Sequence, residues 1–214
     1  MGNLARFDLS RYASTYGLNV LVETGTFRGH GVEAALSAGF ERIISIEIID
    51  QYFNENVERF KDRPNVEILK GHSANVLGQV AGCIEGDVLF WLDAHFPGAD
   101  GGLAGFNAEP DESVRCPLEK ELEAIRLHRP DRNDVFLIDD LRLYEPGDYQ
   151  EGSLPADVRP PDKSGIDFAV ALFGKTHHFV RLPFDEGYLL ILPKTELPKI
   201  YVRRRLDEIT GRPN

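Results

Sequence analysis

The chain has 214 residues, of which 42% are hydrophobic and 28% are charged, so it can bury one sizeable core but is short for two domains. Its formal net charge of −11 disfavours nucleic-acid and anionic-membrane partners, because a negative field repels phosphates. Its two cysteines give neither a disulfide framework nor a metal-ligand spacing. Without a leader-like segment or an apolar run of about 20 residues, we expect one cytoplasmic domain over residues 1–214.

Short apolar runs rich in Val, Ile and Leu alternate along the chain with segments of helical periodicity. The strand-like runs are Leu18–Val22, Arg42–Ile46, Val66–Leu69, Asp87–Leu92, Val135–Ile138, His178–Leu182 and Tyr188–Leu192. The helix-like segments are Val32–Phe40, Gln51–Phe60, Ala74–Val80, Leu118–His128 and Ile166–Phe173. This alternation predicts an α/β protein with a doubly wound, mostly parallel sheet covered on both faces. The last two runs are close in sequence, which predicts an antiparallel pair at the edge.

The segment from Glu23 to Gly31 (ETGTFRGHG) connects the first predicted strand to the first predicted helix. A strand, a glycine turn and a helix N-terminus form a corner at which open α/β sheets bind nucleotides. Gly25 can adopt the angles of a sharp turn, and Gly29 or Gly31 lets the helix begin close to the sheet. A carboxylate at Glu23 would repel a pyrophosphate, whereas it suits a cofactor with a cationic amino group, such as S-adenosylmethionine. Thr26 and Phe27 lie in the turn and belong to the predicted cofactor contacts.

The ends of the next two predicted strands carry further candidate cofactor residues. Glu47 lies 22 positions after Gly25, close to the spacing of about 20 that is typical of a ribose-binding acid. A carboxylate there can accept hydrogen bonds from both ribose hydroxyls. His72 and Ser73 follow the third strand, in positions that would flank an adenine ring, although a surface histidine is an equal interpretation of His72.

Polar side chains also end the fourth and fifth predicted strands. Asp93 and His95 follow the fourth strand, and Asp139 and Asp140 follow the fifth. Because these strands are neighbours in a doubly wound sheet, the side chains should converge and would repel one another without a cation or a shared proton. Oxygen ligands suit Mg²⁺. His95 is either a further ligand, which would favour Mn²⁺, Fe²⁺ or Zn²⁺, or a general base.

Taken in order, these motifs resemble those of the class I S-adenosylmethionine-dependent methyltransferases over roughly residues 18–144. The resemblance rests on Glu23–Gly29, Glu47, Gly71–Asn75, Leu92–His95 and Ile138–Asp140. It implies a Rossmann-like, seven-stranded sheet with its last strand antiparallel. Phe27 stands where the usual acid-x-Gly-x-Gly-x-Gly pattern has its middle glycine, as in some branches that include sugar O-methyltransferases.

The acids after the fourth and fifth strands look like those of metal-dependent small-molecule O-methyltransferases. That resemblance implies that Asp93, Asp139 and Asp140 hold Mg²⁺ or Mn²⁺, which orients the acceptor oxygens and lowers the pKa of the attacking hydroxyl. The alternative is that Asp93 contacts only the cofactor while Asp139 and Asp140 cap the next turn. We assign the catalytic role to His95 and Asp93.

The expected function is therefore methyl transfer to a hydroxyl of a small, sugar-like acceptor, with no nucleic-acid or membrane partner and a homodimer left open. Two long segments, 96–114 and 145–163, are predicted to be loop lids. The acids of the 118–128 helix fit a solvated face, although Glu119 or Glu121 could approach the crevice. Other hypotheses are a noncatalytic nucleoside-binding subunit, a metal-dependent hydrolase built on the Asp/His cluster, and an NAD-dependent enzyme, which Glu23 disfavours.

Overall fold

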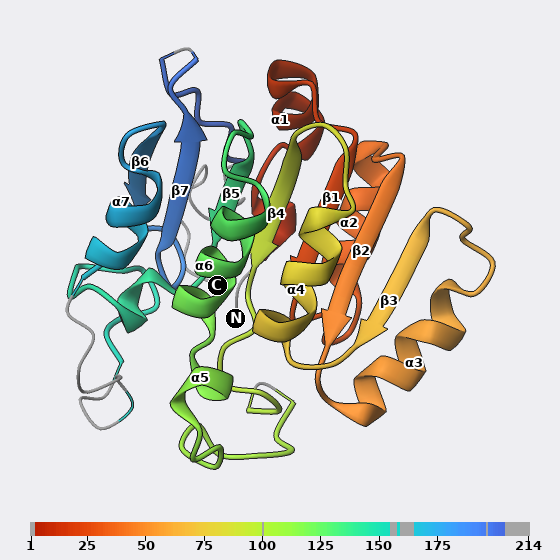
Figure 1. Ribbon diagram of the computed structural model, residues 1–214. Helices are drawn as coiled ribbons and strands as arrows, with labels where there is room; N and C mark the ends of the chain where they lie inside the picture. Colours follow the sequence, from red (N-terminus) through yellow and green to blue (C-terminus); the bar gives the residue numbers. More distant parts are fainter. Residues whose placement is uncertain (1–2, 100, 155–157, 159–164, 196, 204–214) are drawn as a thin grey trace.

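One seven-stranded sheet organises the protein, with the strand order β3-β2-β1-β4-β5-β7-β6 (Figure 1). The structure is a computed structural model that describes residues 3–99, 101–154, 158, 165–195 and 197–203. The strands are β1 (Val20–Thr24), β2 (Arg42–Glu47), β3 (Val66–Lys70), β4 (Val88–Leu92), β5 (Val135–Ile138), β6 (His177–Leu182) and β7 (Tyr188–Pro193).

The first five strands pair in parallel, whereas β7 runs antiparallel to both of its neighbours, β5 and β6. The predicted seven-stranded, mostly parallel sheet and the antiparallel hairpin at its end are therefore confirmed. The first strand begins two residues later than predicted, because Gly17 ends the preceding helix in a left-handed conformation with a φ of 67° and the chain straightens only after Leu18. As a result, Glu23 is the penultimate residue of β1 rather than the residue after it.

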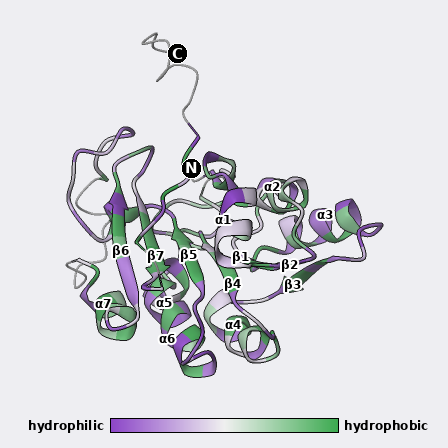
Figure 2. Cartoon of the chain, turned by 90° about the horizontal axis from the view of Figure 1, so that it is seen from above, coloured by the Kyte–Doolittle hydropathy of each residue, from purple (hydrophilic) through white to green (hydrophobic). Residues whose placement is uncertain are grey.

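Helices cover both faces of the sheet, as predicted (Figure 2). One face carries α1 (Leu9–Tyr16), α2 (His30–Ala38) and α3 (Asp50–Phe60), together with the 3-10 turn η1 (Leu4–Arg6). The other face carries α4 (Ser73–Gly82), α6 (Leu118–His128) and α7 (Asp167–Phe173). Two short elements, α5 (Glu112–Arg115) and η2 (Leu141–Leu143), lie within the connections after β4 and β5.

Helix α1 was not predicted, although its sequence carries the signals of a helix. The Asp8 side chain accepts a hydrogen bond from the Arg11 amide at the N-terminus, and Gly17 ends the helix. Its apolar side is short: Leu9 and Tyr12 are its fully buried residues. Tyr12 packs edge-on against Phe7, with ring centroids 6.3 Å apart. Helix α1 thereby adds to the cover that α2 and α3 provide on the same face of the sheet.

Alternate residues of each central strand face the two helical layers. In β4, Phe90 and Leu92 pack toward α4 and α6, whereas Leu89 and Trp91 pack toward α1 and α2. Because β1 to β5 run parallel, their carboxyl ends lie at one edge of the sheet, from which the longest connections leave. Among the described residues, no helix is long and apolar enough to cross a membrane.

Candidate cofactor and metal site

A cavity of about 510 Å³ opens at the carboxyl edge of the parallel strands, within the range of about 300–1,000 Å³ that is typical of small-molecule sites. Its lining comes from the turn after β1, the end of β2, the start of α4 and the segment after β4. Of the residues predicted to bind the cofactor, those that line it are Glu23, Gly25, Thr26, Phe27, Glu47, His72, Ser73 and Asp93. Gly29 is not part of the lining.

Glu23 lies at the floor of the cavity, only 2% exposed. Its carboxylate accepts a hydrogen bond of 2.6 Å from the Ser45 hydroxyl. A Cβ atom at Gly31 would lie 1.6 Å from Oε1 of Glu23, so the glycine allows the first turn of α2 to rest directly on this acid. Burial raises the pKa of Glu23 to about 8, and the nearby charge of Glu47 acts in the same direction.

The glycines of the corner serve close backbone approach. Gly25 has a φ of 81°, and a Cβ there would lie 2.3 Å from the carbonyl oxygen of Asp93, so the turn after β1 packs against the end of β4. Gly29 has a φ of 75°, and its Cβ would lie 2.3 Å from Oδ1 of Asn56. Gly29 therefore lets α2 begin against α3, which explains its position outside the cavity.

Glu47 is held in place by two backbone amides. The Phe27 amide donates to Oε2 at 2.8 Å, and the Ile49 amide donates to Oε1 at 2.7 Å. Burial raises the pKa of Glu47, although both hydrogen bonds oppose that shift. Phe27 occupies the left-handed region, with a φ of 47°, a conformation that favours glycine. The hydrogen bond to Glu47 and an edge-on contact with Tyr52, with centroids 4.8 Å apart, support this conformation.

His72 caps helix α4 and also reaches the long loop after β4. Its Nδ1 accepts from the Ala74 amide at 3.1 Å, so its Nε2 carries the proton and donates to the Ser113 carbonyl, also at 3.1 Å. His72 therefore lines the cavity, where a residue beside an adenine ring would lie, and it also joins the loop to the start of α4.

Glu121, which we expected mainly on a solvated face, points into the interior and is only 1% exposed. The hydroxyls of Ser73 and Thr24 and the charge of His95 lower the pKa of this carboxyl, whereas its Oε1 has no hydrogen-bond partner among the described residues. Burial nevertheless raises the pKa of Glu121 to about 7. Thus α6 contributes a buried acid beneath the cavity, in agreement with the alternative that Glu119 or Glu121 approaches the crevice.

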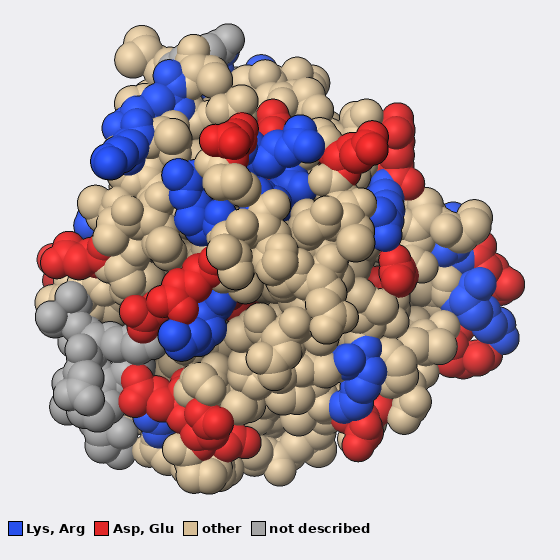
Figure 3. All heavy atoms as spheres, in the orientation of Figure 1, with Lys and Arg blue, Asp and Glu red and all other residues tan. Residues whose placement is uncertain are grey.

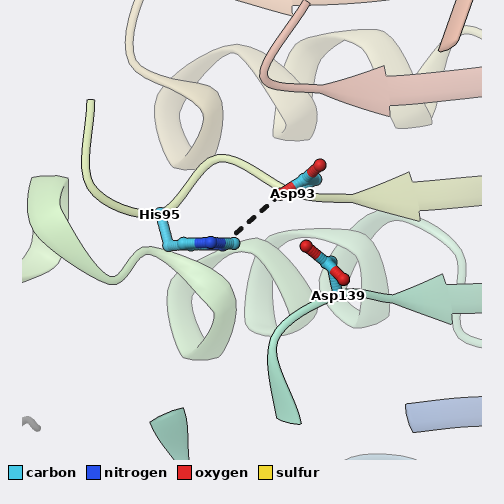
Figure 4. A group of neighbouring side chains, drawn as sticks. All are labelled: Asp93, His95 and Asp139. Atoms are coloured by element: carbon cyan, nitrogen blue, oxygen red, sulfur yellow. Dashed lines mark ion pairs between the residues drawn. The ribbon is translucent and has the colours of Figure 1, made fainter. Parts of the chain in front are cut away.

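Asp93, His95 and Asp139 form a compact group of metal-ligating side chains (Figure 4). One ligand atom from each lies within 4.8 Å of the others, and Nδ1 of His95 is 3.5 Å from Oδ1 of Asp93. Asp139 is only 2% exposed, and neither of its carboxylate oxygens has a hydrogen-bond partner among the described residues. Burial raises the pKa of Asp139 to about 7.

Asp140 lies beside this group and contacts both His95 and an arginine. Its Oδ1 accepts a hydrogen bond of 2.8 Å from Nε of Arg142, and its Oδ2 lies 3.5 Å from Nε2 of His95. Arg142 also lies 3.9 Å from Glu186 in the turn between β6 and β7. The structure therefore brings together Asp93, His95 and Asp139 as candidate ligands, with Asp140 adjacent and paired to an arginine.

The two predicted lids differ in how much of them the structure describes. Most of 96–114 is described and lies against the cavity, through Phe96, Pro97, Gly98, Gly101 and Val114. Of the 145–163 segment, residues 155–157 and 159–163 lie outside the described residues. Its remaining residues contribute nothing to the cavity lining.

No protein-family model matches the chain, and no curated protein matches it. Among solved structures, it resembles the S-adenosylhomocysteine-bound methyltransferase PaMTH1 of Podospora anserina, with 15% identity over 87% of this chain and 76% of that one and a TM-score of 0.56. A putative caffeoyl-CoA O-methyltransferase of Staphylococcus aureus gives 16% identity, 86% and 80% coverage and a TM-score of 0.57. A putative rRNA methylase of Clostridium thermocellum gives 12% identity over 90% of this chain and 98% of that one, with a TM-score of 0.55. The chain therefore has the Rossmann-like methyltransferase fold that the motifs predicted.

Proposed function

We propose that the chain is an S-adenosylmethionine-dependent methyltransferase. The observation that carries this proposal is a pair of buried carboxylates, Glu23 and Glu47, in one cavity at the carboxyl edge of the sheet. Glu47 alone would suit the ribose of a dinucleotide as well, but the pyrophosphate of a dinucleotide would meet the carboxylate of Glu23 at the corner where it needs hydrogen-bond donors. A nucleoside with a cationic amino group at one end and a ribose near its centre matches both acids.

Each binding residue has a distinct role in this proposal. Glu23 attracts the amino group of the cofactor, and the first amides of α2 attract its carboxylate. Glu47 accepts hydrogen bonds from the ribose hydroxyls and is already oriented by the Phe27 and Ile49 amides. Because those amides hold the carboxylate before a ligand arrives, little ordering entropy is lost when it binds. His72 and Ser73 border the adenine end.

The group of Asp93, His95 and Asp139 fits a divalent cation. The carboxylates of Asp93 and Asp139 repel each other unless a positive charge lies between them. Asp139 has no hydrogen-bond partner for its oxygens among the described residues. Ligand atoms within 4.8 Å of one another need only small side-chain rotations to share an ion with bonds of about 2.0–2.2 Å. Two oxygen donors and one nitrogen favour Mn²⁺ as well as Mg²⁺.

A bound divalent ion would lower the pKa of an acceptor hydroxyl. The residues of the chain would then orient that hydroxyl, exclude water and accept its proton. His95 has two alternative roles: as a ligand it would bind the ion, and if it is not a ligand it is the candidate base, because its ring lies between the carboxylates of Asp93 and Asp140, at 3.5 Å from each. Those carboxylates would stabilise the imidazolium that forms. The acceptor we propose is a small polar molecule with a hydroxyl, sugar-like in character.

The remaining expectations about partners stay predictions. Acidic and basic side chains are interspersed over the face of the molecule seen in Figure 3, which agrees with a small-molecule acceptor rather than a nucleic acid or a membrane. A cytoplasmic setting and a homodimer are likewise predictions. The hydrolase hypothesis uses the same Asp93, His95 and Asp139 group but needs neither Glu23 nor Glu47.

Calorimetric titration tests the proposal directly. We expect S-adenosylhomocysteine to bind with one site per chain and NAD⁺ not to bind, and we expect methyl transfer from labelled S-adenosylmethionine to a panel of polyols and catechols to require Mn²⁺ or Mg²⁺. Cofactor binding without transfer to any acceptor would favour the noncatalytic subunit. Hydrolytic activity that persists without the cofactor would favour the hydrolase.

The affinity for S-adenosylhomocysteine should rise between pH 6 and pH 8. Burial holds the pKa of Glu23 at about 8, so below that pH the free protein carries a proton that the cationic amino group must displace. Linkage then strengthens binding by up to about tenfold per pH unit. In Glu23→Gln, which keeps the shape and the Ser45 contact, the slope should become much shallower. Calorimetry at pH 6, 7 and 8 measures it, and an unchanged slope in the variant would remove Glu23 from the amino-group site.

A further inference from the structure

The loop after β4 is closed at its base and compact. The Phe96 amide donates to the Arg115 carbonyl at 2.8 Å, which joins the two ends of the loop. Near its start, the Gly98 carbonyl accepts from the Leu103 amide at 3.0 Å and the Ala104 amide at 3.2 Å. A loop with touching ends and its own internal hydrogen bonds resembles an Ω-loop, although the segment between Phe96 and Arg115 is longer than the roughly 6–16 residues typical of that class.

The tight turn of this loop reaches across the cavity. A Cβ atom at Gly101 would lie 1.7 Å from the Tyr52 hydroxyl and 3.3 Å from Cε2 of Phe27. Gly101 and both aromatic residues line the cavity. Tyr52 belongs to α3 and Phe27 to the turn after β1, so the loop from β4 touches elements on the opposite side of the predicted cofactor site.

A second contact fastens the returning half of the loop. Nε2 of His72 donates to the carbonyl of Ser113 at 3.1 Å, next to the predicted adenine position. The loop therefore meets the cavity wall at two places, one by hydrogen bonding at His72 and one by van der Waals packing at Gly101. A side-chain atom at position 101 would force the Tyr52 hydroxyl or the loop to shift, whereas the hydrogen bond uses a backbone carbonyl that any residue at position 113 would supply.

We propose that Gly101, Tyr52 and Phe27 form a latch that closes this loop over the bound nucleoside and sets the rate at which the nucleoside dissociates. The proposal rests on the proposed function and adds Tyr52 and Gly101 to the cofactor-binding residues. The latch holds because a bare backbone at Gly101 lets the loop settle on the Tyr52 hydroxyl and the edge of Phe27. A larger residue at 101 would prop the loop open and expose the nucleoside to water.

The test compares two glycines of the same loop. A Cβ atom at Gly105 would meet nothing within 4 Å, and the φ of Gly105 is not positive, so Gly105→Val is a control of equal chemistry. We expect Gly101→Val to raise the dissociation rate of S-adenosylhomocysteine, measured by stopped-flow displacement, by about tenfold or more, a change worth about 1.4 kcal/mol. The dissociation rate of Gly105→Val should stay within about twofold of the wild-type rate, a difference too small for such comparisons to resolve.

A rescue experiment separates a latch from general damage to the loop. Tyr52→Phe removes the atom nearest to Gly101, so Gly101→Ala combined with Tyr52→Phe should release S-adenosylhomocysteine more slowly than Gly101→Ala alone. Equal dissociation rates in the Gly101 and Gly105 variants, or no rescue by Tyr52→Phe, would overturn the latch while the wild-type protein still binds. Failure of the wild-type protein to bind would overturn the proposed function instead. Thermal unfolding of each variant confirms that it is folded.

Discussion

Replacing Glu47 with alanine should weaken S-adenosylhomocysteine binding by about 100-fold or more. Two hydrogen bonds from ribose hydroxyls to a carboxylate, at about 1.5–3 kcal/mol each, account for that loss. The substitution also removes the acceptor for the Phe27 and Ile49 amides, so Phe27 loses the contact that supports its positive φ. Calorimetry at pH 8 measures the change.

A matched control is Glu67→Ala on the neighbouring strand β3. Glu67 is exposed and pairs with Arg42 at 3.2 Å, far from the cavity lining, so the affinity of this variant should equal that of the wild-type protein. If Glu47→Ala bound as tightly as Glu67→Ala, the ribose would not lie on β2 and the cofactor assignment would fail.

Asp139→Asn should make the metal-free protein more stable at pH 8 while abolishing its response to Mn²⁺. Burial raises the folded-state pKa of Asp139 to about 7, against about 3.9 in an unfolded chain. Between these values the unfolded state releases a proton that the folded state keeps, so the free energy of unfolding falls as the pH rises from about 4 to about 7. Above pH 7 the free energy of unfolding of the wild-type protein is therefore lower by the order of a few kcal/mol. Asparagine does not ionise, so the variant avoids this loss.

Urea unfolding at pH 4.5 and pH 8, with and without Mn²⁺, measures both effects. The variant should gain stability over the wild-type protein at pH 8 and little at pH 4.5. Mn²⁺ should raise the urea concentration at which half of the wild-type protein unfolds, because it binds only the folded state, and leave that of Asp139→Asn unchanged. Asp131→Asn, at an exposed position, is the control. An equal Mn²⁺ response in all three proteins would contradict the metal site.

The sequence was sufficient to predict the edge of the sheet at which the site lies. Glu47, Asp93 and Asp139 each stand at or after the end of a parallel strand, and the ends of such strands must meet at one edge. Continuous apolar runs also predicted all seven strands, within a residue or two at their ends. Helix α1 was missed although the sequence carries its signals: Leu9 and Tyr12 lie on one face, Asp8 caps the start and Gly17 ends the helix.

The directions of the other side chains in the site could not be predicted, because they depend on the path of the backbone and on long-range packing rather than on a local sequence pattern. Asp140 follows a strand end like Asp139, but its φ of 52° turns the backbone, and its side chain meets Arg142. Glu121 is buried because α6 packs its first turn over Ser73 and Thr24, which depends on the path of the long loop before it. That same path brings Gly101 against Tyr52, two residues about fifty positions apart in the sequence.

The central claim is that the acid at the end of β1 receives an ammonium group and the acid at the end of β2 receives a ribose. A crystal structure of the protein with S-adenosylhomocysteine at saturating concentration tests it most directly. The account predicts the amino group within reach of Glu23, directly or through one water, and both ribose hydroxyls on Glu47. An empty corner, or the nucleoside bound elsewhere on the chain, would contradict it.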